Sequence, residues 1–517
     1  MAIERVGRRW GGDGWVPVAG AAAVAVALTL WATSHYGPGA EPDTVTYLAA
    51  ARHLRAGHGF ADIDGSPLTL FPPVFPAAVA ALEGLGLGPL PAARFLNAAL
   101  FGLLVVLGGL WARRLTGSAA AGGVVAAVLA LSTPMVAMAS AALSEPIGIV
   151  LAVGCLMLLT ESLRTGTGPG GRAGAGLGLA GAAGLAAGLA CLTRYASVVL
   201  YPVGGAVLLA GTGRWRTRLA AAAAFLAAGL TPLLAWLARN VAAAGNATGD
   251  GRGTSALSPP ASTRLTLAAV GAWILPGGTP EAFRVVAGAG LCLAVVVPLG
   301  LMARRDRRAA VVLPVAAFVA AGVASVAWFE ATMAIDPPPR FLLPVFVPLV
   351  VGAAVVVAGP GRRRGRSPAL AAGLVVAVAA LSLPRLGAFE MRARRDGLLD
   401  YSTPAWTASP LLAWLKAHPV PGTVASDDPY ILDLRLGIPA DLTPSRTYYA
   451  SHEPTGELPA FLRRAARAAA AGGLWVVWFP RAYQPFLYSL DDLQRSMCLV
   501  EERHFPDGDL LRACPKT

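Results

Sequence analysis

Long apolar runs, separated by short polar or basic segments, fill most of the chain up to about residue 390. A run of about 20 apolar residues has the length that an α-helix needs to cross a bilayer. The pattern therefore predicts a mainly α-helical, polytopic transmembrane bundle of about eleven spans. We place them at 16–33, 92–112, 118–139, 145–163, 175–192, 196–211, 219–238, 284–303, 309–329, 341–359 and 368–386.

The segment between the first two predicted spans, residues 34–91, has a different pattern. Apolar residues at helical spacing (Val45, Leu48 and Leu54) predict a short amphipathic helix. A glycine-rich turn follows it, and then a proline-led apolar piece over 72–88 that is too short to span. We expect a first outer loop with two helices, the second lying half-inserted in the membrane or on its surface.

Charge fixes an orientation for this bundle. The chain carries a formal net charge of +13, and its arginines cluster in short segments between apolar runs. With the N-terminus inside, every dense cluster falls on the inner side, as the positive-inside rule requires. These clusters lie at 5–9, 113–114, 164–172, 214–218, 304–308 and 362–366. No basic stripe with interleaved aromatic residues is present, so we expect a multi-pass cell-membrane protein and not a nucleic-acid binder.

The same alternation gathers other polar residues on the outer side. Ionisable groups next to hydrocarbon are costly and are functional candidates by default. They include the pair Glu41 and Asp43, and further along the chain Ser144-Glu145, Arg194-Tyr195, Arg239-Asn240, Glu330, Asp336 and Arg340. The sequence thus predicts an active site at the extracytoplasmic face.

After residue 390 the long apolar runs stop, and charged, aromatic and turn residues return. A helix over 410–420, a strand, turn and helix over 422–440, a helix ending at Gly472-Gly473 and a buried strand at 474–480 predict a small α/β domain. The expected division is a membrane domain at 1–390 and a C-terminal extracytoplasmic domain at 391–517. Asp427-Asp428, in a turn before a proline, is interpreted as local capping and not as a metal pair.

Cysteine usage limits the possible chemistry. Cys155, Cys191 and Cys292 lie inside predicted spans, whereas Cys498 and Cys514 both lie in the outer tail. A disulfide between the last two is allowed in an oxidising compartment, but spacing alone does not decide between a disulfide and free thiols. No Cys-x-x-Cys or His-Glu-x-x-His motif supports a zinc enzyme.

The outer loop carries a family resemblance. Asp43-x-x-x-Tyr47, Gly57-x-Gly59 and Pro72-Pro73-x-x-Pro76 are similar to the first outer loop of the GT-C glycosyltransferases. More narrowly, the chain resembles the bacterial protein O-mannosyltransferase and aminoarabinose (lipid A) transferase group over residues 40–390. Ser144-Glu145-Pro146, Arg194-Tyr195 and Arg340-Phe341 fall where that group has comparable motifs.

The resemblance implies a glycosyltransferase that takes a sugar from a polyprenyl-phosphate donor and transfers it to a glycan, lipid or protein acceptor of the cell envelope. By analogy Asp43 is the general base, with Glu145 as a second catalytic acid. The implied substrate-binding residues are Glu41, Tyr47, Arg194, Tyr195, Arg239 and Arg340. The family often has two adjacent acids where this chain has Asp43 and Thr44, so the second acidic role stays open between Glu41, Glu145 and none. A divalent metal is compatible with the site but not required.

Simpler roles exist for each candidate. Asp43 suits a helix N-cap, Tyr47 an interfacial anchor, and Glu145 a helix N-terminus. Arg194 and Arg340 also suit snorkelling at the interface, and Arg239 a helix C-terminus. The alternative for the whole protein is a transporter or flippase of lipid-linked saccharides, which would need a polar path through the midplane of the bundle.

Overall fold

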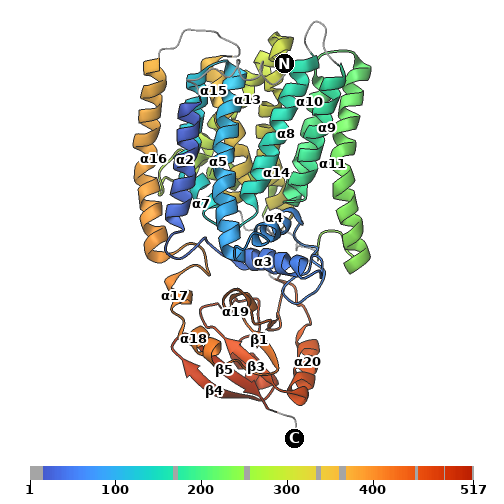
Figure 1. Ribbon diagram of the computed structural model, residues 1–517, viewed down its shortest axis with the longest axis vertical. Coiled ribbons are helices and arrows are strands. Elements are labelled where there is room, and N and C mark those ends of the chain that lie inside the picture. Colours follow the sequence, from blue (N-terminus) through green and yellow to red (C-terminus); the bar gives the residue numbers. More distant parts are fainter. Residues whose placement is uncertain are drawn as a thin grey trace.

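The computed structural model describes residues 15–166, 173–249, 257–333, 339–359, 368–448, 452–482 and 484–514. An elongated helical bundle forms one end of the molecule and a small mixed sheet with short helices forms the other (Figure 1). The arginine clusters at 5–9 and 362–366, together with Arg172 and Asp336, lie outside the described residues.

A helix, or a pair of consecutive helices, covers each predicted span. The bundle consists of α2 (Val16–Ala32), α5 (Pro89–Thr116), α6 (Ala119–Ala130), α7 (Thr133–Ala139), α8 (Glu145–Gly166), α9 (Ala173–Cys191), η2 (Tyr195–Val199), α10 (Leu200–Ala210), α11 (Trp215–Ala244), α12 (Pro259–Gly271), α13 (Glu281–Arg305), η3 (Arg307–Val312), α14 (Leu313–Thr332), η4 (Pro339–Leu342), α15 (Leu343–Ala358) and α16 (Pro368–Asp396).

Seven helices in the described ranges are long and apolar enough to cross a membrane, and α6 with α7, bent by 61°, raises the number to eight if the pair is one span. Helix α2 and the segment Tyr195–Ala210 are apolar but shorter. The protein is therefore a mainly helical membrane protein, while the number of eleven spans and the N-in orientation remain predictions.

Helix α12 was not predicted, because the sequence after Arg239 reads as a polar loop. Two of its polar residues face inward: Ser262 and Thr266 donate hydrogen bonds to the carboxylate of Glu330 on α14, at 3.2 and 3.0 Å. Glu330 is 3% exposed. Because hydroxyl groups occupy buried positions of this helix, the helix has no clear apolar stripe. The hydrophobic periodicity of its sequence is therefore weak.

Glycines allow helices α9 and α11 to approach closely. A Cβ on Gly184 of α9 would lie 2.0 Å from the carbonyl oxygen of Phe225 on α11, and one on Gly188 would lie 2.5 Å from that of Gly229. Small residues at such crossings let helix backbones touch in membranes. The glycine content of α9 therefore serves packing inside the bundle, and this packing fixes where the chain leaves α9 towards Arg194.

The predicted outer loop contains two helices, as expected: α3 (Pro42–Arg55) and α4 (Val74–Glu83). Both lie across the end of the bundle, between it and the C-terminal sheet (Figure 1). Tyr47, Leu48 and Ala51 of α3 pack with Phe75 and Val79 of α4 in one apolar cluster.

The C-terminal part forms a five-stranded sheet in the order β2-β1-β3-β5-β4. Strands β1, β2 and β3 are parallel, and β5 is antiparallel to both β3 and β4. The strands are β1 (Thr423–Ser426), β2 (Asp441–Leu442), β3 (Leu474–Trp478), β4 (Leu499–Phe505) and β5 (Gly508–Ala513). The helices are α17 (Pro404–Thr407), α18 (Pro410–Ala417), α19 (Pro429–Leu436), α20 (Leu458–Ala471) and α21 (Leu490–Ser496).

Every C-terminal element that the sequence predicted is present, and the capping interpretation of Asp428 is confirmed, because its side chain accepts the Ile431 amide at the start of α19. The β4–β5 hairpin was missed, since most of β4 is exposed and lacks alternation. Cys498 and Cys514, which flank this hairpin, form a disulfide.

The sheet domain packs against α3. Ala40 and Val45 lie in one apolar cluster with Trp406, Leu411 and Phe479. Arg52 of α3 pairs with Asp433 of α19, with 2.5 Å between Nη2 and Oδ2. The start of α3 therefore lies between the membrane bundle and the C-terminal domain.

Candidate functional site

Helix α3 presents its first-turn acids because of its own capping. Glu41 is the N-cap, and the Thr44 hydroxyl accepts the Glu41 amide at 3.2 Å in a capping box. Pro42 occupies the first helical turn, where a missing N–H costs no hydrogen bond. Glu41, and not Asp43, is thus the N-cap, and the Asp43 carboxylate is left to contact other parts of the chain.

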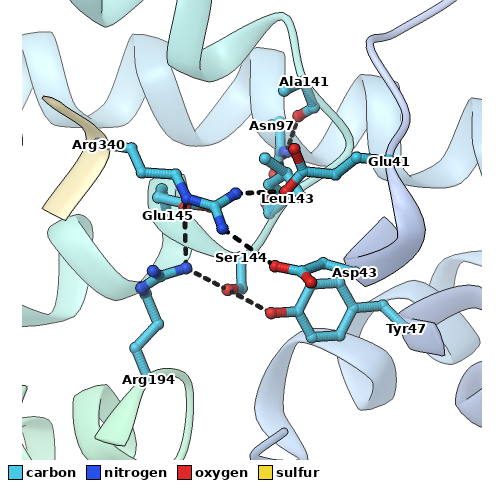
Figure 2. Close-up of polar contacts among 10 residues, drawn as sticks. All are labelled: Glu41, Asp43, Tyr47, Asn97, Ala141, Leu143, Ser144, Glu145, Arg194 and Arg340. Carbon is cyan, nitrogen blue, oxygen red and sulfur yellow. Dashed lines mark hydrogen bonds and ion pairs between the residues drawn. The ribbon is translucent and has the colours of Figure 1, made fainter. Parts of the chain in front are cut away.

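Two arginines meet three carboxylates at this point (Figure 2). Arg340, at the start of the η4–α15 segment, pairs with Glu41 and lies 3.2 Å from Asp43 and 3.7 Å from Glu145. Arg194, just after α9, lies 2.8 Å from Glu145. Glu145 therefore touches both guanidinium groups. We call these five side chains the ion-pair cluster.

The side chains of the cluster differ in their exposure to solvent. The Glu145 side chain is 3% exposed, whereas those of Asp43 and Arg340 are 28% exposed. Asp43 is thus the most exposed carboxylate of the cluster and the most accessible to an incoming molecule, while Glu145 is the most buried one. Burial raises the pKa of Glu41; Arg340 opposes that rise, and the charges of Asp43 and Glu145 add to it.

Tyr47 and Ser144 lie next to the cluster and are connected to it by hydrogen bonds. The Ser144 hydroxyl lies 3.1 Å from the Tyr47 hydroxyl and accepts a hydrogen bond from Arg194 at 3.2 Å. Tyr47 is 2% exposed and packs edge-on against Phe71 and Phe75. Burial raises the pKa of Tyr47, so it stays a neutral phenol. Tyr47 is therefore a buried support and not an interfacial anchor.

Tyr195 and Arg239 lie at a second place. Arg239 donates to the carbonyl oxygens of Phe60 and Leu68, at 2.9 and 2.8 Å. The Tyr195 hydroxyl donates to Thr69 O and accepts from Trp236. Both residues hold the 60–69 segment of the outer loop, so their contacts are with the loop backbone and not with the ion-pair cluster.

Sequence reasoning assigned no role to two residues that build the site. Ser144 lies next to Glu145 in the Ser144-Glu145-Pro146 motif, and this position was the only feature of the sequence that could have indicated its role. Asn97 on α5 is fully buried and donates to the carbonyl oxygens of Ala141 and Leu143, at 2.7 and 2.9 Å (Figure 2). Nothing in the apolar sequence around Asn97 relates it to a segment more than forty residues later.

The two guanidinium groups are the part of the cluster that suits an anion. Its carboxylates face guanidinium groups, and within the described ranges no three His, Cys, Asp or Glu side chains are arranged to hold a metal ion. Arginine presents planar, paired donors that match phosphate geometry. The arrangement can therefore receive a phosphate group next to a partly open carboxylate.

The sequence matches no protein-family model and no curated protein. The fold, however, is similar to solved structures. ArnT from Cupriavidus metallidurans bound to undecaprenyl phosphate superposes with a TM-score of 0.64 at 14% identity, over 98% of this chain and 100% of that one. The apo state of the same protein gives 0.64 at 15% identity, over 97% and 99%.

A second similar structure is the archaeal oligosaccharyltransferase AglB from Archaeoglobus fulgidus, in complex with an inhibitory peptide and a dolichol-phosphate. It has a TM-score of 0.57 at 12% identity, over 89% of this chain and 69% of that chain. At these identities the similarity concerns the fold. Together with the helical bundle and the outer-loop helices described above, it shows that this chain has the fold of the GT-C membrane glycosyltransferases.

Proposed function

We propose that this protein is a glycosyltransferase that moves a sugar from a polyprenyl-phosphate donor to a hydroxyl group of an acceptor. The observation that carries the proposal is the ion-pair cluster at one end of a GT-C bundle. The similar ArnT structure contains undecaprenyl phosphate and the AglB structure contains a dolichol-phosphate. A lipid-phosphate donor is therefore the substrate class that the fold supports best.

In the proposed reaction, Asp43 removes the proton of the acceptor hydroxyl while the hydroxyl oxygen forms a bond to the anomeric carbon of the sugar. The bond between that carbon and the phosphate oxygen breaks, and the lipid phosphate leaves with the electron pair. A base within hydrogen-bond reach of the acceptor contributes typically about 10²–10⁴-fold in rate. Asp43 is the preferred base because it is the most exposed carboxylate of the cluster.

Arg340 and Arg194 are the proposed phosphate contacts. Fixed cationic donors stabilise the charge that develops on a leaving phosphate. Arg340 is paired with carboxylates, so an arriving phosphate competes with Glu41 and Asp43 for its donors. Transfer of Arg340 to the phosphate would leave a carboxylate oxygen of Asp43 free to accept the proton.

Glu145 is the proposed second acid. It contacts both arginines from a buried position, so its role in this proposal is to hold the two guanidinium groups side by side. Glu41 also pairs with Arg340 and is the third carboxylate of the cluster. Tyr195 and Arg239 act on substrate binding through the 60–69 loop that they hold.

The proposal includes the orientation of the chain in the membrane and the boundary between its two domains. With the N-terminus inside, the cluster and the domain at 391–517 face the extracytoplasmic side of the cell membrane, where envelope glycans, lipids and proteins supply acceptor hydroxyls. The clustering of charges at one end of the bundle favours transfer over transport, since a transporter needs its binding site near the midplane.

The test is Asp43→Asn in membranes supplied with a radiolabelled polyprenyl-phosphate sugar. We expect transfer to fall by about 100-fold or more, at unchanged expression. Asp64→Asn is the matched control, because Asp64 lies on the same outer loop and its carboxylate accepts only a local turn amide among the bonds described, from Ser66. Transfer by Asp43→Asn at the level of this control would remove Asp43 as the base.

A further inference from the structure

The two acid-bearing segments of the cluster are joined by their backbones. The Gly39 amide donates to Ser140 O at 2.9 Å, and the Ala142 amide donates to Gly39 O at 2.8 Å. Gly39 precedes Glu41 by two residues, and Ala142 precedes Glu145 by three residues. Because two or three residues span at most about 7–11 Å, we expect a movement of this bridge to displace the carboxylates.

Asn97 holds this bridge to the bundle. Its side-chain amide donates to Ala141 O and Leu143 O, on both sides of Ala142. Its own oxygen, Oδ1, is buried and accepts no hydrogen bond within the described part of the chain. Burying an unpaired carbonyl is unfavourable, so the polar contacts of Asn97 that favour its burial are the two hydrogen bonds that it donates.

We infer that Asn97 is a positioning residue for the proposed reaction. It ties the segment 140–144 to helix α5 and thereby sets both the place of Glu145 and, through the bridge to Gly39, the place of Glu41 and Asp43. Without its donors, two buried carbonyl groups lose their partners and the segment is free to shift. A displacement of about 1 Å at reacting groups can lower a rate by about 100-fold.

This inference rests on the proposed function for its effect on catalysis, but the geometric part can be tested without activity. The variant is Asn97→Leu in the full-length protein, which keeps the volume and removes both donors, with Asn97→Ala as a second variant if the first does not fold. The matched control is Tyr201→Phe, which removes another buried side-chain-to-backbone bond of the bundle, from the Tyr201 hydroxyl to Gly229 O at 2.9 Å.

The first measurement is hydrogen exchange of the peptides that contain the Gly39 and Ala142 amides. We expect exchange there to be at least about 10-fold faster in the Asn97 variants, since local opening follows the loss of hydrogen bonds, and unchanged in Tyr201→Phe. Equal exchange in the Asn97 variants and the control would overturn the inference.

The second measurement is transfer per folded molecule. We expect kcat to fall by about 10- to 100-fold in the Asn97 variants, with a smaller change in KM for the donor, because both arginines stay paired with Glu145 while the place of Asp43 relative to them changes. A kcat equal to that of Tyr201→Phe would overturn the positioning role. If the wild-type protein transfers no sugar but the exchange result is as expected, the proposed function fails and the anchoring by Asn97 stands.

Discussion

The pair of Glu145 and Arg194 offers a quantitative test of the ion-pair cluster. Their closest atoms are 2.8 Å apart, and their side chains are 3% and 17% exposed. At an effective dielectric constant of about 20, the attraction between unit charges at this separation is about 6 kcal/mol. Desolvation of a buried carboxylate is unfavourable by several kcal/mol and offsets part of this attraction.

The two single substitutions differ in what they leave behind. Arg194→Gln leaves Glu145 buried, with Nε of Arg340 at 3.7 Å as its remaining cation, and we expect a loss of about 3 kcal/mol in unfolding free energy. Glu145→Gln leaves a guanidinium that is more exposed and keeps the Ser144 hydroxyl, so the expected loss is about 2 kcal/mol. The double variant removes both charges and is expected to lose about 3 kcal/mol, which gives a coupling of about 2 kcal/mol.

The assay is a double-mutant cycle on purified protein in one detergent at one scan rate, since thermal midpoints of such proteins depend on the rate of heating. The wild type, both single variants and the double variant are unfolded in parallel. The midpoint of the double variant should lie near that of Arg194→Gln. Midpoint losses that add up across the two sites would refute a direct ion pair and, with it, the geometry of the cluster.

Three further predictions concern other parts of the fold. Burial, with a smaller contribution from the charge of Asp428, raises the pKa of Asp427 to about 8 against an opposing bond from the Phe479 amide. An acid whose pKa is raised on folding stabilises the fold only while protonated, so this contribution is full below about pH 4 and is lost as the pH rises through about 8; Asp427→Asn should flatten the decline in thermal midpoint between pH 5 and 8, and an unchanged slope would contradict the assignment. Replacing Cys498 and Cys514 by alanine should destabilise the β4–β5 hairpin by about 2–4 kcal/mol, measured as earlier proteolysis of the C-terminal strands, and equal proteolysis of the wild type with and without reductant would count against a stabilising disulfide. Gly39→Ala should lower sugar transfer, because the new Cβ would lie 3.0 Å from Leu399 and 3.1 Å from Leu398. Gly148→Ala, whose Cβ would lie 3.5 Å from Thr193, should retain transfer. Equal activity of the two variants would show that the segment between α2 and α3 tolerates displacement at Gly39.

Some of this protein could be predicted from the sequence because it depends on length and alternation alone. Apolar runs of about 20 residues become helices wherever they occur, and the order of spans decides on which end of the bundle each connecting segment lies. For this reason Glu41, Asp43, Glu145, Arg194 and Arg340 were expected at one end, and the structure brings them into contact there.

The same rule placed Tyr195 and Arg239 at that end but could not say what they touch. Alternation of spans fixes the end of a helix, whereas its rotation and neighbours are set by side-chain packing. Arg239 therefore binds carbonyl oxygens of the 60–69 loop. Tyr47, which suited a membrane interface, is buried against Phe71 and Phe75.

What only the tertiary structure decided is how distant segments meet. The sequence determined a helical membrane bundle, its polar end and a small α/β domain, because these follow from local periodicity and composition. The tertiary structure decided that Arg340 pairs with acids almost 300 positions earlier in the chain, and that a single buried amide, Asn97, joins α5 to the turn before Glu145. Such contacts depend on the packing of the whole bundle, and no local pattern in the sequence encodes them.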